Sequence, residues 1–222
     1  MTRLLTSLFA VSYVALGCAS PATPSSTAHA DVSAPDRTPA RPLAALAAQR
    51  LIVLPVQTLR GGDSLGWGAR IPGMRSYLAS VDDEIAFALA ERGLKDTWVY
   101  PPALARSARR SPTLAVDPYA LGASALRTAQ RAEGSPLVDP LASQLRALVA
   151  LHDARYALVP AELRFEGANE KGRAVLWLAL VDARSATLRW AGDVASDPVG
   201  AFSPALAASL AVRLAELVVA AP

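Results

Sequence analysis

Residues 51–56 form an uninterrupted apolar run, LIVLPV, which constrains the fold more than any other feature of the sequence. Short apolar runs that are rich in branched side chains are typical of strands buried on both faces of a sheet. Strands of this kind occur mostly in parallel sheets with helices on both sides. The segment GGDSLGWGARIPG at 61–73 follows, and its glycines predict a loop.

A helix is expected to follow this loop. Ser80 resembles an N-cap with Asp83 three residues later, and the acidic residues 82–84 suit the positive end of a helix dipole. Gly93 suits the end of the helix, and residues 97–100 (TWVY) predict a short strand that stops at a pair of prolines. The order predicts a β-α-β unit with parallel strands and a right-handed crossover.

The order of helices and strands is less clear in the rest of the chain. In the Ala-rich part 103–139 the best helix candidate is 119–132, and a clearer helix is predicted at 140–152 with Asp139 as its N-cap. Strands are expected at 155–166, 173–182 and 188–196, and a last helix after Ser203 and Pro204. Strict alternation in the first of these strands places one set of residues on a common face: Ala157, Val159, Ala161, Leu163 and Phe165.

These elements predict an α/β (α+β) domain. It has a mixed sheet of about five strands with helices packed on it, a β-α-β start, a β-meander and a C-terminal helix. The expected boundaries are 1–17 for a signal peptide, 18–42 for a tether and 43–222 for a single domain. About 180 residues suffice to bury a core of ordinary size.

The amino-terminal boundaries rest on a secretory pattern. Arg3 precedes an apolar stretch at 4–16, which is too short for a bilayer span of about 20 residues, and Gly17 and Cys18 follow. Residues 19–42 are dominated by Ala, Pro, Ser and Thr without apolar periodicity, so a disordered tether is expected. Cys18 is the single cysteine of the chain and is the predicted lipidation site, with a stray or buried thiol as the alternative.

The order of signal, cysteine, tether and domain resembles Gram-negative outer-membrane lipoproteins. By that resemblance Leu16, Gly17 and Cys18 end a lipobox, although Ala15 stands where leucine is usual. Ala19 after the cysteine implies the outer membrane as the destination. The resemblance therefore implies a lipid bilayer as partner through acylated Cys18, with the domain in the periplasm.

The domain itself resembles the TolB amino-terminal domain, CsgG and LpoB. The residues that carry the resemblance are "LIVLPV" at 51–56, "ALAERG" at 88–93, "VYPPALAR" at 99–106, "QLRALVALHDARYALVPAELRF" at 144–165 and "LWLALVDARSATLRWAGDV" at 176–194. Such domains serve assembly, binding or regulation at the cell envelope without catalysis, so the resemblance implies an envelope protein as partner. It leaves the identity of that protein and the oligomeric state open.

No motif of established chemistry is evident. The 61–73 loop lacks the Gly-Lys-Ser/Thr of a phosphate loop, and no Gly-x-Ser-x-Gly elbow occurs. We interpret the loop as a flexible connection or as an interaction loop in which Trp67 and Arg70 contact a partner. His29 and His152 lack metal-ligand spacing, and His152 is expected to be a favourable charge at a helix end.

Charge excludes a further class of partner. The densest basic spot, Arg106 with Arg109 and Arg110, is short and has no interleaved aromatic residue, so nucleic acid is not an expected partner. We also expect no cofactor, no bound metal and no enzymatic activity.

The sequence thus predicts a membrane-anchored periplasmic binding or assembly module. The alternatives are an oligomeric secretion or transport component like CsgG, or a hydrolase with a site assembled from scattered residues. The first alternative needs pore-lining strands that alternate over about 9–11 residues. Only residues 173–182 approach this length, and they are apolar on both faces, which favours a core strand.

Overall fold

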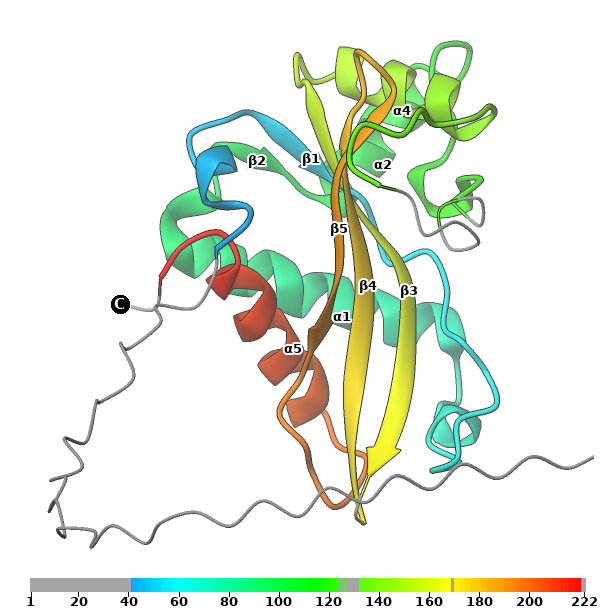
Figure 1. Ribbon diagram of the computed structural model, residues 1–222. Coiled ribbons are helices and arrows are strands. Elements are labelled where there is room, and N and C mark those ends of the chain that lie inside the picture. The colour runs from blue at the N-terminus through cyan, green and yellow to red at the C-terminus, as the bar shows by residue number, and fades with distance from the viewer. Residues whose placement is uncertain (1–40, 124–125, 127–131, 169, 221–222) are drawn as a thin grey trace, which may run out of the picture. The chain divides into compact units, whose positions relative to one another are not determined.

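A five-stranded mixed sheet with strand order β2-β1-β3-β4-β5 organises the chain (Figure 1). The computed structural model describes residues 41–123, 126, 132–168 and 170–220. Cys18 and the expected signal peptide and tether up to residue 40 lie outside the described residues. β1 pairs in parallel with β2 and β3, whereas β3, β4 and β5 form an antiparallel meander. The predicted β-α-β start and meander are therefore confirmed.

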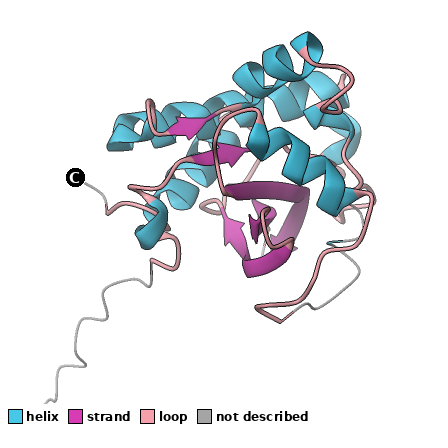
Figure 2. Cartoon of the chain, turned by 90° about the horizontal axis from the view of Figure 1, so that it is seen from above, coloured by secondary structure: helices cyan, strands magenta, loops and turns pink. Residues whose placement is uncertain are grey.

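The strands are β1 (Leu51–Val53), β2 (Trp98–Val99), β3 (Tyr156–Ala168), β4 (Lys171–Asp182) and β5 (Thr187–Ala195). The α-helices are α1 (Met74–Leu89), α2 (Pro101–Arg110), α4 (Leu141–Ala150) and α5 (Ala205–Glu216). Short turns of helix lie at η1 (Ala44–Leu46), η2 (Gly68–Arg70), η3 (Ala90–Leu94) and η4 (Pro118–Ala120). Figure 2 shows the helices gathered on the outside of the sheet.

The two faces of the sheet carry separate cores. On one face, α1 and α5 bury Ile85 and Leu210 with Leu176 of β4. On the other face, α2 and α4 bury Leu104 and Leu145 together with residues of β1 and β3. In Figure 1, α2 and α4 lie near one end of the long strands, and β3 and β4 extend well beyond them. Part of the second face of the sheet is therefore not covered by these helices.

The start of α1 differs from the predicted start. The helix begins at Met74, directly after extended Gly73, so Ser80 lies inside it and its hydroxyl donates to the Tyr77 carbonyl at 2.7 Å. Serine satisfies its hydroxyl in this way within helices, and its value as a cap is then lost. The predicted capping box is wrong, and the acidic residues 82–84 lie in the middle of the helix. The predicted end is confirmed, because Gly93 has φ of 81° in η3.

The prolines at 101 and 102 begin a helix. We expected them to stop β2, which ends at Val99, but they also open α2, with Pro101 at its first position. Proline fits there because the first amide of a helix has no carbonyl partner. Of the candidate helix 119–132, η4 covers the beginning, while residues 124–125 and 127–131 lie outside the described residues.

A β-bulge breaks the predicted alternation of β3. The register with β4 shifts between Pro160 and Glu162, so that Ala161 is the extra residue. Ala157, Val159 and Ala161 belong to the core under α2 and α4, but Leu163 and Phe165 belong to the core under α1 and α5. The prediction of one common face is therefore wrong, because an added residue exchanges the faces of everything after it.

The predicted helices at 140–152 and after Ser203 are confirmed with shifted caps. α4 begins at Leu141, and the Asp139 carboxylate accepts the Ser143 N–H at 3.0 Å. α5 begins at Ala205 and has Pro204 rather than Ser203 in the cap position. Along α5, Leu206, Leu210 and Leu214 are buried, as their spacing predicts.

Candidate functional site

Asp82 lies in the middle of α1, and its carboxyl group reaches the chain just after β1. The Val56 N–H donates to Asp82 Oδ1 at 2.8 Å. The residue is only 6% exposed, and the buried Oδ2 has no hydrogen-bond partner among the described residues. A buried polar atom without a partner carries a desolvation penalty of about 1–3 kcal/mol, and more when the group is charged. Asp82 therefore stands out from the rest of the core.

A pocket of about 310 Å³ opens beside this carboxyl group. Small-molecule sites usually occupy about 300–1,000 Å³, so the pocket has the size of a small ligand. Its walls come from the first turns of α1, from the chain after β1 and from η4. The lining residues are Val56, Gln57, Met74, Arg75, Leu78, Ala79, Asp82 and Tyr119.

Side-chain hydrogen bonds hold the walls in place. Gln57 Nε2 donates to the Pro55 carbonyl at 2.8 Å and to the Pro118 carbonyl at 3.0 Å, which ties the end of β1 to η4. The Asp117 carboxylate accepts the Tyr119 N–H at 3.0 Å and starts the η4 turn. Both amide hydrogens of Gln57 are therefore committed, and its oxygen is the part of the amide that remains for a ligand.

The pocket runs along one side of α1, from an open mouth to a buried end. Met74 is 55% exposed and Arg75 is exposed, whereas Leu78 and Asp82 are buried. Seven residues separate Arg75 from Asp82, which places both on the same side of the helix about 10 Å apart along its axis. The guanidinium group thus belongs to the mouth and the carboxyl group to the buried end.

The charge of Asp82 is unfavourable in this environment. Burial raises the pKa of Asp82 to about 7, the Val56 N–H works in the opposite direction, and the nearby Asp83 adds to the rise. Burial also raises the pKa of the Tyr119 hydroxyl, and the neighbouring carboxylates of Asp82 and Asp117 raise it further. A cation delivered to the pocket would stabilise the ionised form of Asp82.

The predicted interaction loop is ordered around Asp63. Its carboxylate accepts the backbone N–H groups of Leu65 at 3.1 Å, Trp67 at 2.9 Å and Gly68 at 2.9 Å. Burial, which raises the pKa of Asp63, is outweighed by these three donors, so the pKa lies below its ordinary value. The interpretation of this segment as a flexible connection is therefore not supported by its hydrogen bonding.

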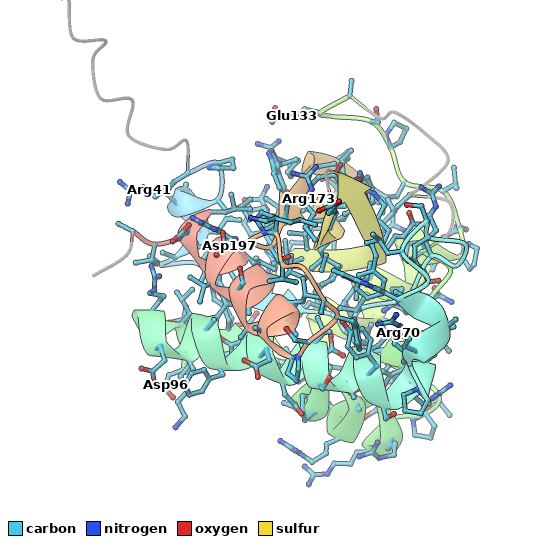
Figure 3. The ribbon with its side chains drawn as sticks, turned by 90° about the horizontal axis from the view of Figure 1, so that it is seen from below. Arg41, Arg70, Asp96, Glu133, Arg173 and Asp197 are labelled. Carbon is cyan, nitrogen blue, oxygen red and sulfur yellow. The ribbon has the colours of Figure 1, made fainter. Side chains whose placement is uncertain are left out.

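Trp67 and Arg70 differ in accessibility. Trp67 is 4% exposed, and its ring contacts those of Phe165 and Phe202 at centroid distances of 5.8 and 6.0 Å. Its packing is that of a core residue and leaves no open ring face to a partner. Arg70 is exposed at the end of η2, close to the start of α1 (Figure 3). A contact of this loop with a partner stays a prediction.

Charged residues cover the sheet face that α2 and α4 leave open. Arg164 binds Asp193 through two nitrogen atoms at 2.9 and 3.0 Å, and it also donates to Glu166 at 2.9 Å. Arg173 completes the group with a 2.9 Å contact to Glu166. Since every member has an oppositely charged partner, this network is best explained as a solvated surface and is a weaker candidate site than the pocket.

His152 does not match its predicted role. Burial and the nearby guanidinium group of Arg50 lower the pKa of His152, which opposes the positive charge that we expected at this helix end. The Arg50 side chain donates to the His152 carbonyl at 2.7 Å, and His152 Nε2 is buried without a partner among the described residues. Arg50 thus supplies a donor to one carbonyl that lies just after the end of α4.

The pocket residues were not singled out by the sequence. Asp82 was explained as part of a helix start, and Gln57, Met74, Arg75 and Tyr119 carry no motif. A usable signal was nevertheless present, because Asp82 is spaced four residues after Leu78 and three before Ile85. Residues at this spacing share a helix face, so an acidic residue was placed on the apolar stripe.

The described ranges contain neither a grouped set of metal ligands nor a helix suited to cross a membrane. Between residues 41 and 220, omitting the gaps, no three His, Cys, Asp or Glu side chains are grouped as metal ligands. Across the same part of the chain, no helix has the length and apolar character that a membrane crossing requires.

No family model matches the chain, and no curated protein matches it. Solved structures with some likeness include the PelC dodecamer from Paraburkholderia phytofirmans, at 13% identity and a TM-score of 0.39, covering 79% of this chain and 91% of that one. The LpoB C-terminal domain from Salmonella enterica is 17% identical with a TM-score of 0.35, covering 67% of this chain and 82% of that one. E. coli LpoB is 17% identical with a TM-score of 0.35, and 85% of each chain is covered. LpoB, one of the proteins that the sequence resembles, is thus among the structural neighbours, but likenesses this weak carry no argument about function.

Proposed function

We propose that this chain is a lipoprotein of the bacterial envelope whose domain acts as a non-catalytic binding module. Its anchor is Cys18, acylated after removal of residues 1–17, and its destination is the periplasmic side of the outer membrane. The observation that carries the proposal is the order of basic residue, short apolar run and Gly17-Cys18, followed by a Pro/Ser/Ala-rich stretch. Two or more acyl chains on one cysteine give stable membrane binding, so the domain needs no membrane-binding surface of its own.

The chemistry of the pocket supports binding rather than catalysis. Acyl or phosphoryl transfer needs a nucleophile with a base, a metal or an array of cations at the reacting group. The lining offers one carboxyl group, one phenol, one amide and a guanidinium group at the mouth. Asp82 has no histidine, cysteine or serine beside it in the lining. These groups suit recognition of a ligand.

Metabolic labelling tests the anchor. Cells that express the full chain are grown with an alkyne analogue of palmitate, and the purified protein is coupled to a fluorophore. The wild-type chain is expected to be labelled and to fractionate with the outer membrane, while Cys18→Ala is expected to lose the label and leave the outer-membrane fraction. An unlabelled wild-type chain would refute the proposal.

A matched control tests whether loss of the label is specific to Cys18. Ser20→Ala changes a polar side chain two residues after Cys18 and leaves the signal and the cysteine intact. We expect it to be labelled like the wild type. Loss of label in both variants would show that the loss is not specific to Cys18, which counts against the anchor.

A further inference from the structure

We propose that the pocket beside Asp82 binds a primary ammonium group carried on a short apolar chain, with the ammonium ion paired with the Asp82 carboxyl group. This inference rests on the proposal that the domain is a binding module, but it does not depend on acylation of Cys18. It is drawn from the described residues alone.

One oxygen of the Asp82 carboxyl group lacks a hydrogen-bond partner among the described residues. Asp82 Oδ1 accepts the Val56 N–H, while Oδ2 is buried and has no partner among the described residues. None of the ion pairs in that part of the chain includes Asp82. The carboxyl group avoids the cost of an unpaired buried charge by keeping its proton in the free protein, and a cation in the pocket would pair with its ionised form.

The lining indicates the kind of cation. A metal ion needs several ligands, and no three suitable side chains are grouped among the described residues. An ammonium group needs only oxygen acceptors. Beside Asp82 the lining supplies the Tyr119 hydroxyl and Gln57, whose nitrogen is already bound to two carbonyls and which therefore offers its oxygen.

The remaining walls indicate the body of the ligand. Between the buried end and the mouth the walls are Val56, Leu78 and Ala79, with exposed Met74 at the rim. These side chains suit a short alkyl chain. Arg75 at the mouth repels a second positive charge, so the far end of the ligand is neutral or anionic. A monoamine fits the pocket better than a diamine of the same length.

The test uses the methionine methyl groups of the full-length protein in detergent. The chain has two methionines, Met1 and Met74, so a ¹³C-methyl label reports directly on the mouth of the pocket, with Met1 as an internal reference where it is retained. n-Butylamine is titrated against the isosteric n-butanol and against 1,4-diaminobutane. We expect a saturable Met74 shift for butylamine, with about ten-fold or more weaker binding of the alcohol and weaker binding of the diamine.

Three variants make the result specific. Asp82→Asn is expected to weaken butylamine binding by about ten-fold or more, and Ala79→Leu to weaken it by filling the pocket. Asp83→Asn removes the neighbouring exposed carboxylate and is expected to bind like the wild type. Unchanged butylamine affinity in both Asp82→Asn and Ala79→Leu, or no Met74 shift in the wild type, would overturn the inference.

The proposed amine site and the proposed lipid anchor are refuted by different results. A palmitate-labelled protein whose Met74 signal does not respond to butylamine refutes only the amine site. An unlabelled protein whose Met74 signal responds refutes only the anchor and leaves the amine site standing. Tryptophan fluorescence of each variant shows whether the domain is folded, since Trp67 and Trp98 are buried in its core.

Discussion

Replacing Asp82 by asparagine is expected to stabilise the domain at neutral and alkaline pH. Asparagine is neutral at every pH and keeps an oxygen that can accept the Val56 N–H, which Asp82 Oδ1 accepts at 2.8 Å. The wild-type carboxyl group has a pKa of about 7 in the folded state against an ordinary value of 3.8. The wild type and Asp82→Asn therefore differ most in stability at the pH values where the buried aspartate must ionise.

The sign follows from proton binding. Between pH 3.8 and about 7, folded Asp82 holds its proton while the unfolded chain has released it. Stability falls with rising pH wherever the folded state binds more protons than the unfolded state. Asp82 thus contributes no penalty below pH 4, an increasing penalty through this window and a constant one above pH 7.

The size of the effect follows from the same two values. The pKa rises from 3.8 to about 7, and each pH unit corresponds to about 1.4 kcal/mol, so the full penalty is about 4 kcal/mol. We take this as an upper value, because buried groups relax and admit water. Asp82→Asn should therefore gain a few kcal/mol over the wild type at pH 8 and almost nothing at pH 4.

Urea unfolding followed by tryptophan fluorescence measures this difference. The free energy of unfolding of wild type and variant is determined at pH 4, 6 and 8. Comparing the two proteins at each pH cancels the groups whose pKa is lowered, such as Asp63 and Asp182, which act with the opposite sign. Asp83→Asn is the matched control, because Asp83 is exposed and is the smallest of the causes that shift the pKa of Asp82, so its removal should change little.

Two results would refute this reasoning. One is an Asp82→Asn variant that is no more stable than the wild type at pH 8. The other is a difference in unfolding free energy that stays constant from pH 4 to pH 8, which would show that asparagine acts through packing or hydrogen bonding. A change in the denaturant m-value would have to be excluded first, because it reports a different extent of unfolding.

Other perturbations have smaller or simpler effects. Trp67→Ala should lower the unfolding free energy by about 3–5 kcal/mol in urea, because it removes a large buried ring. Arg164→Ala should cost about 1–3 kcal/mol by the same measurement, because the Arg164 side chain is 19% exposed and loses a two-nitrogen contact with Asp193 and a contact with Glu166. Gly93→Ala should lower the melting temperature by an amount equivalent to about 1 kcal/mol, because φ is 81° there. Ala15→Leu should increase the palmitate-labelled fraction of the chain at equal expression, because it restores the usual lipobox residue.

Much of the fold follows from local patterns in the sequence. The apolar run at 51–56 required a strand buried on both faces, and Ile52 and Val53 of β1 do face different cores. The leucine spacing of α5 likewise defined its buried side. In these elements the residue pattern and the tertiary contacts agree, so the pattern alone was sufficient.

The predictions went wrong where tertiary contacts overrode a local signal. Ser80 and Asp83 have the spacing of a capping box. α1 nevertheless begins earlier, at Met74, and it buries Leu78 and Val81 in the core. The β-bulge in β3 has a sequence marker that the alternation of apolar residues conceals, because Pro160 precedes the extra residue Ala161 and a proline inside a central strand indicates a bulge. The first error placed the start of α1 too late in the chain. The second error placed the side chains after Ala161 on the wrong face of the sheet.

The error at α1 also concealed the candidate site. An acidic residue in the first turn of a helix needs no further explanation, since the dipole favours it. The same residue two turns into the helix, on the buried side, is a charge in an apolar environment. The correct start of α1 therefore changes the interpretation of Asp82 from an acidic residue in the first turn to a buried carboxyl group beside a pocket.

The predicted stability penalty and the proposed amine site have one physical origin, the desolvation of Asp82. A cation that enters the pocket pairs with the ionised carboxyl group and removes the penalty that burial imposes. The bound ligand should therefore stabilise the wild type more at pH 8 than at pH 4 relative to Asp82→Asn, which has no charge to pair. Sites adapted to binding are often less stable than the fold allows. If the pocket binds amines, Asp82→Asn should gain unfolding free energy in the free protein and lose affinity for the amine. Both changes come from the same charge, so the stability measurement and the binding measurement test one another.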